Sequence, residues 1–245
     1  MSRYKLIIQY DGALFFGWQM QTDLRTVQGE IENALKNIYK TNDRIPVYGS
    51  GRTDTGVHAI GQVAHFDIKT KLPTVKLKDA INANLSDDCR IISIEKVLDN
   101  FHARFSALKR HYRYQCFRGN SILYRNQAWC IRINNINRIN RLAKLLIGNH
   151  DFTSFSKKRI NNQHNICEIF KAEWKDDGEF INFFITGNRF LHHMVRYLVG
   201  TMVQNINGDL SENSFHSLLS CPQKDAKIYK APPQGLILEK VDYYV

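Results

Sequence analysis

The sequence of 245 residues lacks the features that mark several large classes of protein. No apolar run approaches the roughly 18 residues needed to span a bilayer, and the N-terminal segment is too short and too polar for a secretory signal. The five cysteines are odd in number, and no two have CxxC spacing. A disulfide framework and a thiolate zinc site are therefore not expected, and we expect a protein of the cytoplasm that does not enter a membrane.

The motifs of the common cofactor and metal enzymes are also missing. The sequence contains no GxxxxGK[ST] phosphate loop, no GxGxxG that opens a helix, and no HExxH. Metal-assisted hydrolysis requires several carboxylates or histidines that converge on one point. In this sequence few of them gather near any one point. We therefore expect no nucleotide or small-molecule cofactor and no catalytic metal.

Positive charge is what the sequence has in excess. Lys and Arg number 34 against 23 Asp and Glu, which gives a formal charge of +11. Such an excess attracts polyanions, mainly by releasing counterions from phosphates. Charge alone leaves nucleic-acid binding and a role in solubility equally open. The basic runs Lys109-Arg110 and 157–159 are candidates for contact with RNA, or else ordinary solvated faces.

The hydrophobic pattern alternates short strand-like runs with amphipathic helices. Strands are expected at 4–10, 47–49, 62–68, 90–97, 111–117, 129–133, 167–174, 180–186 and 236–243, and helices at 27–39, 75–85, 136–147, 189–205 and 211–219. Two β-α-β-β-α-β-like halves predict an α+β fold of two ferredoxin-like lobes, 1–104 and 105–245, with mainly antiparallel sheets joined into a central sheet. A cleft between the lobes is the expected ligand site.

The most unusual segment is the loop at 49–62, GSGRTDTGVHAIGQ. Its glycines allow unusual backbone angles and close approach of a ligand, and they stand on both sides of Arg52 and Asp54. An ordinary glycine-rich hairpin with solvated charges is the alternative, but it would not need glycines on both sides of the RTD triplet. The loop is therefore the candidate catalytic segment.

The run GRTDTGVHAIGQVAHF resembles the signature of the TruA-type tRNA pseudouridine synthases, with Thr55 where that family most often has Ala. Further blocks that resemble the family are YDGALFFGWQMQ near the N-terminus, 105–114, 148–156, 187–196 and 231–238. The resemblance implies the pseudouridine synthase fold and a reaction that isomerises uridine to pseudouridine at positions 38, 39 and 40 in the anticodon stem-loop of tRNA. It also implies a homodimer in which one tRNA contacts both subunits.

The same resemblance implies a role for each of three residues. Asp54 falls at the catalytic aspartate, Tyr112 at a tyrosine that contacts the target base, and Arg196 at an arginine that pairs with the aspartate. Arg196 lies in an apolar stretch, where a snorkelling arginine is the alternative. Tyr112 and Tyr114 are both open to a role in the core, and only the resemblance selects Tyr112.

Other residues carry weaker expectations. Arg52 is expected to fill the gap that a flipped base leaves in the RNA, or to contact a phosphate. Leu236 is expected to pack against the active site, and His58 to order the loop. His192 and His193 are expected to be structural or to contact phosphate, because no third ligand at zinc spacing accompanies them.

Two other functions remain possible from the sequence. A non-catalytic RNA-binding protein could keep the same scaffold, although a binder gains nothing from a buried anion that faces phosphates. A pseudouridine synthase that acts on another RNA would carry the same loop. The sequence also leaves open whether Asp54 attacks C1′ or C6 or assists a glycal route.

Overall fold

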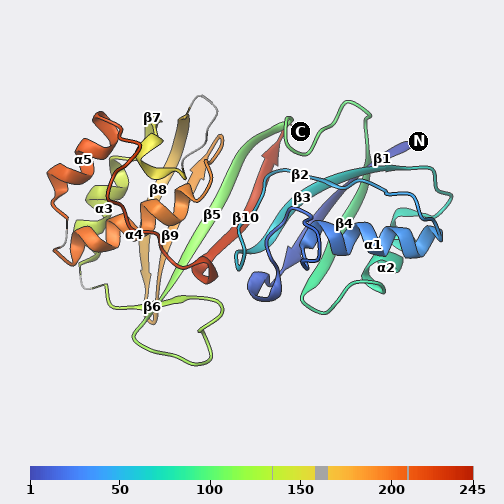
Figure 1. The fold of residues 1–245 in the computed structure, drawn as a ribbon, viewed down its shortest axis with the longest axis horizontal. Helices are drawn as coiled ribbons and strands as arrows, with labels where there is room; N and C mark the ends of the chain where they lie inside the picture. The colour runs from blue at the N-terminus through green and yellow to red at the C-terminus, as the bar shows by residue number, and fades with distance from the viewer. Residues whose placement is uncertain (134, 158–164, 209, 245) are drawn as a thin grey trace. The chain divides into compact units, whose positions relative to one another are not determined.

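The computed structural model describes residues 1–133, 135–157, 165–208 and 210–244 (Figure 1). Lys158 and Arg159, part of the second basic run, lie outside the described residues. The chain divides into two compact units, Met1–Leu108 with Leu238–Val245 (unit 1) and Lys109–Ile237 (unit 2). Most of the last strand belongs to unit 1.

Unit 1 is built on a sheet with the strand order β4-β1-β3-β10. The central strand β1 is antiparallel to both of its neighbours, and Leu6 pairs with Ala64 on one side and Ile94 on the other. A short strand, β2, pairs with β3. The elements are β1 (Ser2–Tyr10), η1 (Gly12–Leu14), α1 (Val27–Tyr39), β2 (Tyr48–Gly49), β3 (His58–Ile68), α2 (Thr74–Asn82), β4 (Cys89–Val97) and β10 (Leu236–Tyr243).

The helix α1 forms where an apolar stripe follows a good N-cap. The Thr26 side chain accepts the backbone N–H of Gly29 at 3.3 Å, which satisfies one of the helix's first N–H groups. Val27, Ile31 and Leu35 follow at helical spacing and are fully buried. α1 packs against α2, which in turn packs along β4.

Unit 2 carries a second sheet, with the strand order β5-β9-β8-β7. These neighbours are antiparallel, whereas β6 pairs with β5 in parallel. α3 packs on β8 and α4, and α5 packs on α4 and β7. The elements are β5 (Ala107–Arg118), β6 (Trp129–Ile131), α3 (Ile136–Lys144), β7 (Gly148–Asp151), η2 (Thr153–Phe155), β8 (Ile166–Asp177), β9 (Phe180–Gly187), α4 (Met194–Ile206), α5 (Glu212–Ser220) and η3 (Pro233–Gly235).

The expected class, a mixed α+β fold with mainly antiparallel strands, is confirmed. Several bounds differ from expectation, and one strand, β7, was not predicted. The largest shifts are at the starts of three elements: β5 begins at Ala107 rather than at 111, β3 at His58 rather than at 62, and α4 at Met194 rather than at 189. The last difference has a local cause, because His193 has φ +65° and a left-handed residue cannot continue a right-handed helix. Among the described residues, no helix has both the length and the apolar character that crossing a bilayer demands.

Candidate active site

The glycine-rich loop joins β2 to β3 in unit 1, and side-chain hydrogen bonds close its base. The Ser50 hydroxyl donates to Gln62 Oε1 at 2.7 Å, and Gln62 Nε2 donates to the backbone oxygen of Gly51 at 3.1 Å. Gln62 is fully buried, so these bonds are shielded from water. The glutamine at the end of the signature is therefore a brace for the loop.

Asp54 is the first residue of a tight turn. The backbone N–H of Val57 donates to the backbone oxygen of Asp54 at 3.1 Å, as in a β-turn, and the third residue, Gly56, has φ +77°. A third turn residue with positive φ favours glycine because it has no Cβ. Thr53 before the turn is buried, whereas Asp54 is half-buried and Arg52 is exposed. The turn therefore holds one carboxylate at the edge of the protein interior.

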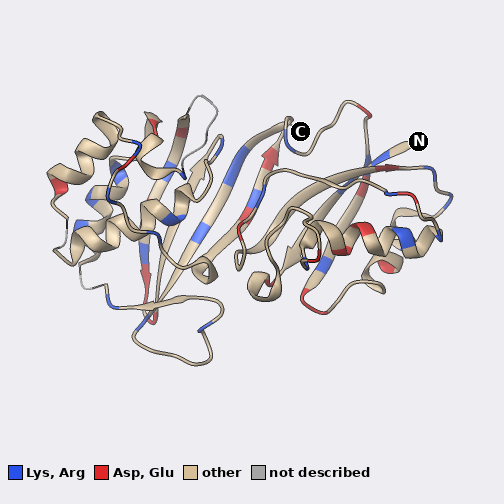
Figure 2. Cartoon of the chain, in the orientation of Figure 1, with Lys and Arg blue, Asp and Glu red and all other residues tan. Residues whose placement is uncertain are grey.

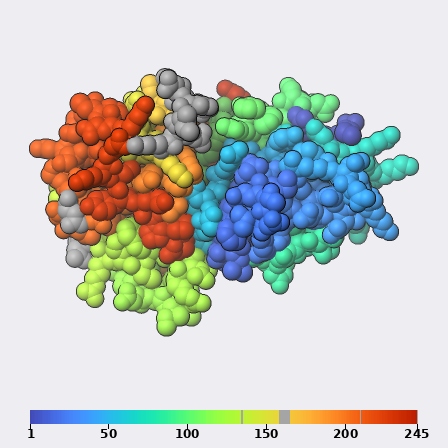
Figure 3. Space-filling view, in the orientation of Figure 1, coloured from blue at the N-terminus to red at the C-terminus, as the bar shows by residue number. Residues whose placement is uncertain are grey.

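The segment between β1 and α1 anchors this turn from the other side. The backbone N–H of Trp18 donates to the backbone oxygen of Thr53 at 3.1 Å, and the N–H of Gly56 donates to that of Phe15 at 3.3 Å. The hydroxyls of Tyr10 and Thr53 share a hydrogen bond at 2.8 Å. In the space-filling view this segment forms the dark blue surface beside α1 (Figure 3). Sequence reasoning did not find these supports, although they explain why the YDGALFFGWQ block accompanies the GRTD loop.

His58, the first residue of β3, ties the loop to η1. Its Nδ1 lies 3.0 Å from the backbone nitrogen of Gly12 and 3.0 Å from Asp11 Oδ1. The ring accepts the Gly12 N–H at Nδ1 and is buried, so it connects the start of β3 to η1.

Arg196 lies in the first turn of α4 in unit 2. The residue is only 7% exposed. Its Nε donates to the backbone oxygen of Ala231 at 2.9 Å, and the N–H of Ala231 donates back to the oxygen of Arg196 at 3.0 Å. A snorkelling arginine would put its guanidinium in water, so that alternative is not what the structure shows.

Tyr112 and Tyr114 occupy different environments on β5. Tyr114 is fully buried and donates its hydroxyl hydrogen to the backbone oxygen of Pro232 at 2.8 Å. Burial raises the pKa of Tyr114 well above its usual value. Tyr112 is half-buried, and its ring stands edge-on to Phe190 at 5.2 Å. Tyr114 is therefore a core residue, whereas part of Tyr112 is accessible. Leu236, the first residue of β10, is buried at 6% exposure.

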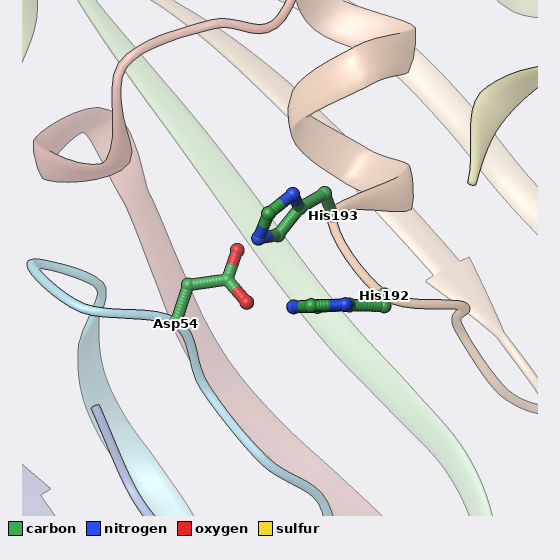
Figure 4. Close-up of side chains that lie close together, drawn as sticks. All are labelled: Asp54, His192 and His193. Carbon is green, nitrogen blue, oxygen red and sulfur yellow. The ribbon is translucent and has the colours of Figure 1, made fainter. Parts of the chain in front are cut away.

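His192 and His193 lie together immediately before α4, with ring centroids 3.9 Å apart. Figure 4 shows them on the segment that leads into the helix, and it shows Asp54 on its own loop beside β3. Lys109 and Arg110, the first basic run, lie on β5, along which Lys and Arg recur in Figure 2. Arg110 donates to the backbone oxygen of Asn188 at 2.6 Å, and the Lys109 ammonium lies 4.5 Å from the centre of the Phe170 ring.

Comparison with known proteins identifies the class. A family model described as "tRNA pseudouridine synthase" matches residues 6–106 and 142–244. The chain is 38% identical to tRNA pseudouridine synthase A of Bacillus licheniformis and 41% identical to that of Bacillus subtilis, each over 98% of this chain and 99% of the relative. It is 40% identical to that of Brachyspira hyodysenteriae, over 98% of each chain.

Among solved structures, a Cbf5-Nop10-Gar1 complex gives a TM-score of 0.37 at 10% identity, over 81% of this chain and 53% of that one. A likeness this loose adds nothing to the assignment. The sequence matches define an isomerase that converts uridine to pseudouridine in RNA. The chain belongs to the tRNA pseudouridine synthase family.

Proposed function

We propose that this enzyme isomerises uridines 38, 39 and 40 in the anticodon stem-loop of tRNA, with Asp54 as its nucleophile. The observation that carries the proposal is the turn at Asp54, which is braced from both sides by buried hydrogen bonds. A nucleophile must be held in one geometry to act, and this turn is suited to that.

The reaction needs little beyond a placed carboxylate. The N1–C1′ bond breaks, the uracil rotates, and C5 joins C1′, while C5 loses a proton and N1 gains one. Substrate and product have the same atoms, so no group or electron enters from a donor. A carboxylate that holds the separated fragment covalently divides this rearrangement into two easier steps.

We assign Arg196 to keeping that carboxylate ionised. A buried guanidinium is costly unless an anion accompanies it, and Arg196 is 7% exposed. A cation near a carboxylate favours the charged form, which is the form that attacks. The hydrogen bond from Nε to the backbone oxygen of Ala231 restrains the guanidinium.

We assign Tyr112, Arg52 and Leu236 to substrate binding. A uridine inside a stem is out of reach, and the enzyme must extrude it at a cost of a few kcal/mol. The half-exposed ring of Tyr112 is suited to stack on the extruded base. Arg52 is exposed beside Asp54, and it is suited to fill the space that the extruded base leaves in the RNA or to contact a phosphate. Leu236 is buried and is suited to form an apolar wall of the active site.

The partner that we propose is tRNA in the cytoplasm, bound by a homodimer. Three relatives that match over nearly their whole length are named for action on tRNA. The formal charge of +11 supports a polyanionic substrate.

The test is pseudouridine formation in an unmodified tRNA transcript, read by chemical mapping of each position. Wild type is expected to modify positions 38 to 40, and Asp54→Asn to form no product while it binds the transcript with unchanged affinity. Asp43→Asn, which alters an exposed aspartate of the same unit, is the control and should keep full activity. If Asp54→Asn formed pseudouridine, Asp54 would not be the nucleophile. If wild type formed pseudouridine only at positions other than 38 to 40, the proposed target would be wrong.

A further inference from the structure

The loop that follows β4, Leu98–Ser106, is held rigidly on unit 1. Arg3 Nη1 donates to the backbone oxygens of Asp99 at 2.6 Å and Phe101 at 2.7 Å. The Tyr243 hydroxyl donates to the oxygen of Ala103 at 2.6 Å, and the N–H of Ala103 donates to His65 Nδ1 at 3.2 Å. Contacts from β1, β3 and β10 therefore fix this loop in one conformation.

Four aromatic rings beside this loop contact one another in a row. We call this row the aromatic ledge, and it consists of Tyr48, His65, His102 and Phe105. Tyr48 stacks on His65 with centroids 5.2 Å apart, His65 meets His102 at 4.6 Å, and His102 meets Phe105 at 4.4 Å. Burial lowers the pKa of both histidines, that of His65 to about 4. Near pH 7 both rings are therefore neutral aromatic surfaces rather than cations.

The two ends of the ledge lie open to solvent. Phe105 is 77% exposed and Tyr48 is 50% exposed. The Arg104 guanidinium lies 5.7 Å from the centre of the Phe105 ring, so a cation accompanies the exposed aromatic surface. A rigid loop that leaves a phenylalanine in water, with an arginine over it, has the composition of a recognition surface.

A hollow of about 740 Å³ adjoins the ledge on the same unit. Its lining includes Phe101 and Ser106 of the rigid loop, and the Lys5 ammonium lies 5.7 Å from the centre of the Phe101 ring. The size is in the range of small-molecule sites. The residues that line it are Lys96, Val97, Leu98, Asn100, Phe101, Ser106, Tyr243 and Tyr244.

The ledge is remote from the nucleophile. His65 lies seven residues beyond His58, at which β3 leaves the catalytic loop. A strand rises roughly 3.3 Å per residue, so this part of β3 is roughly 20 Å from the start of the strand. A group bound here is therefore not the uridine that reacts at Asp54.

We propose that the aromatic ledge and its hollow form a second RNA contact, where unstacked bases of the tRNA outside the target site stack on Phe105, His102 and Tyr48. The proposal rests on tRNA being the substrate. Stacking of bases on aromatic rings, flanked by Arg and Lys, is the usual way proteins hold unstacked nucleotides. The cations beside the ledge, Arg104 and Lys96, complement the phosphates of an RNA.

The test compares tRNA affinity and turnover of Phe105→Ala with wild type. Loss of one stacked base costs about 1–3 kcal/mol, so we expect the Kd for tRNA to rise roughly tenfold, while kcat at saturating tRNA holds. Phe105→Tyr keeps the ring and should restore the affinity. Leu123→Ala removes an equally exposed apolar side chain (81%) from unit 2 and should leave the Kd unchanged.

Equal affinity of Phe105→Ala and wild type would overturn the proposal. It would also be overturned if Phe105→Ala changed the mass of the particle in sedimentation while its tRNA affinity held, because the face would then be a contact between copies. Failure of the proposed function shows differently, as absence of pseudouridine in tRNA treated with wild type.

Discussion

The hydroxyl groups of Tyr10 and Thr53 lie 2.8 Å apart in the interior of unit 1, and both residues are almost fully buried. Thr53 directly precedes Asp54, so this bond fixes the backbone at the point where the proposed nucleophile begins its turn. Tyr10 is the last residue of β1, so this bond connects the sheet to the loop that carries Asp54. We propose that Tyr10 is a positioning residue, whose effect on the reaction passes through Thr53.

We expect Tyr10→Phe to lower kcat with little change in tRNA affinity. Loss of one buried hydrogen bond should also cost about 1 kcal/mol of folding stability. Steady-state kinetics and urea unfolding measure the two effects separately. Tyr4→Phe, which removes the hydroxyl of another buried tyrosine of the same strand away from the loop, is the control and should leave kcat unchanged. Equal kcat values for the two variants would show that Thr53 needs no such support.

The two tyrosines of β5 should respond in opposite ways to substitution. Tyr112→Ala is expected to reduce turnover at least tenfold and to change stability little, because the ring is half-exposed and meets Phe190 edge-on. Tyr114→Phe is expected to cost about 1 kcal/mol of stability, because Pro232 O loses its donor, and to keep turnover. Unchanged kinetics in Tyr112→Ala would make that residue part of the packing.

Gly61 should be intolerant of even one added carbon. A Cβ built there would lie 2.2 Å from the backbone oxygen of Glu239 on the neighbouring strand β10. Gly61→Ala must push β3 and β10 apart, and we expect it to cost about 2 kcal/mol or more, as overpacked sites do. Gly51→Ala is the matched control, because a Cβ at that position meets nothing within 4 Å. Equal thermal midpoints for the two variants would mean that the strands adjust freely.

Stability should fall in mild acid because of His65. In the folded protein its pKa is lowered to about 4, first by burial and then by His102 and Arg3, whereas Asp67 acts in the opposite sense. The unfolded chain, with a pKa of 6.5, binds more protons between pH 6.5 and 4. Stability is therefore expected to decline by up to about 3 kcal/mol as the pH falls through this window.

Urea unfolding at a series of pH values measures this decline. His65→Asn supplies an amide oxygen that can accept the Ala103 N–H but does not titrate, and its midpoint should vary less across the same window. A wild-type midpoint that stays constant from pH 6.5 to 4 would contradict the assignment.

Local signals predicted some elements to the residue. The bounds of α1 agree at both ends because Thr26 caps the helix and the apolar stripe starts directly after it. The closing strand at 236–243 also agrees. The start of α4 was wrong because Phe190 and Leu191 continue the apolar pattern, and periodicity does not register the left-handed backbone of His193. The strand β7 was missed because its residues, GNHD, show no alternation of apolar and polar side chains.

The candidate catalytic loop could be singled out from the sequence because glycines, Arg52 and Asp54 stand close together along the chain. Its supports were not visible, since Tyr10 and Thr53 are 43 positions apart and nothing local connects them. The distinction between Tyr112 and Tyr114 likewise depends on Pro232, which is remote in sequence. Contacts between residues that are far apart in the sequence can be identified only when the fold is known.

The last strand has a consequence for synthesis of the enzyme on the ribosome. Unit 1 holds the loop with the proposed nucleophile, but its sheet includes residues from Leu238 onward, which are translated after all of unit 2. Until they emerge, the nascent chain leaves the β3 edge at Gly61 uncovered, and an open edge invites pairing with other chains. Premature termination shortly before residue 238 would therefore release a protein that is both inactive and prone to aggregate.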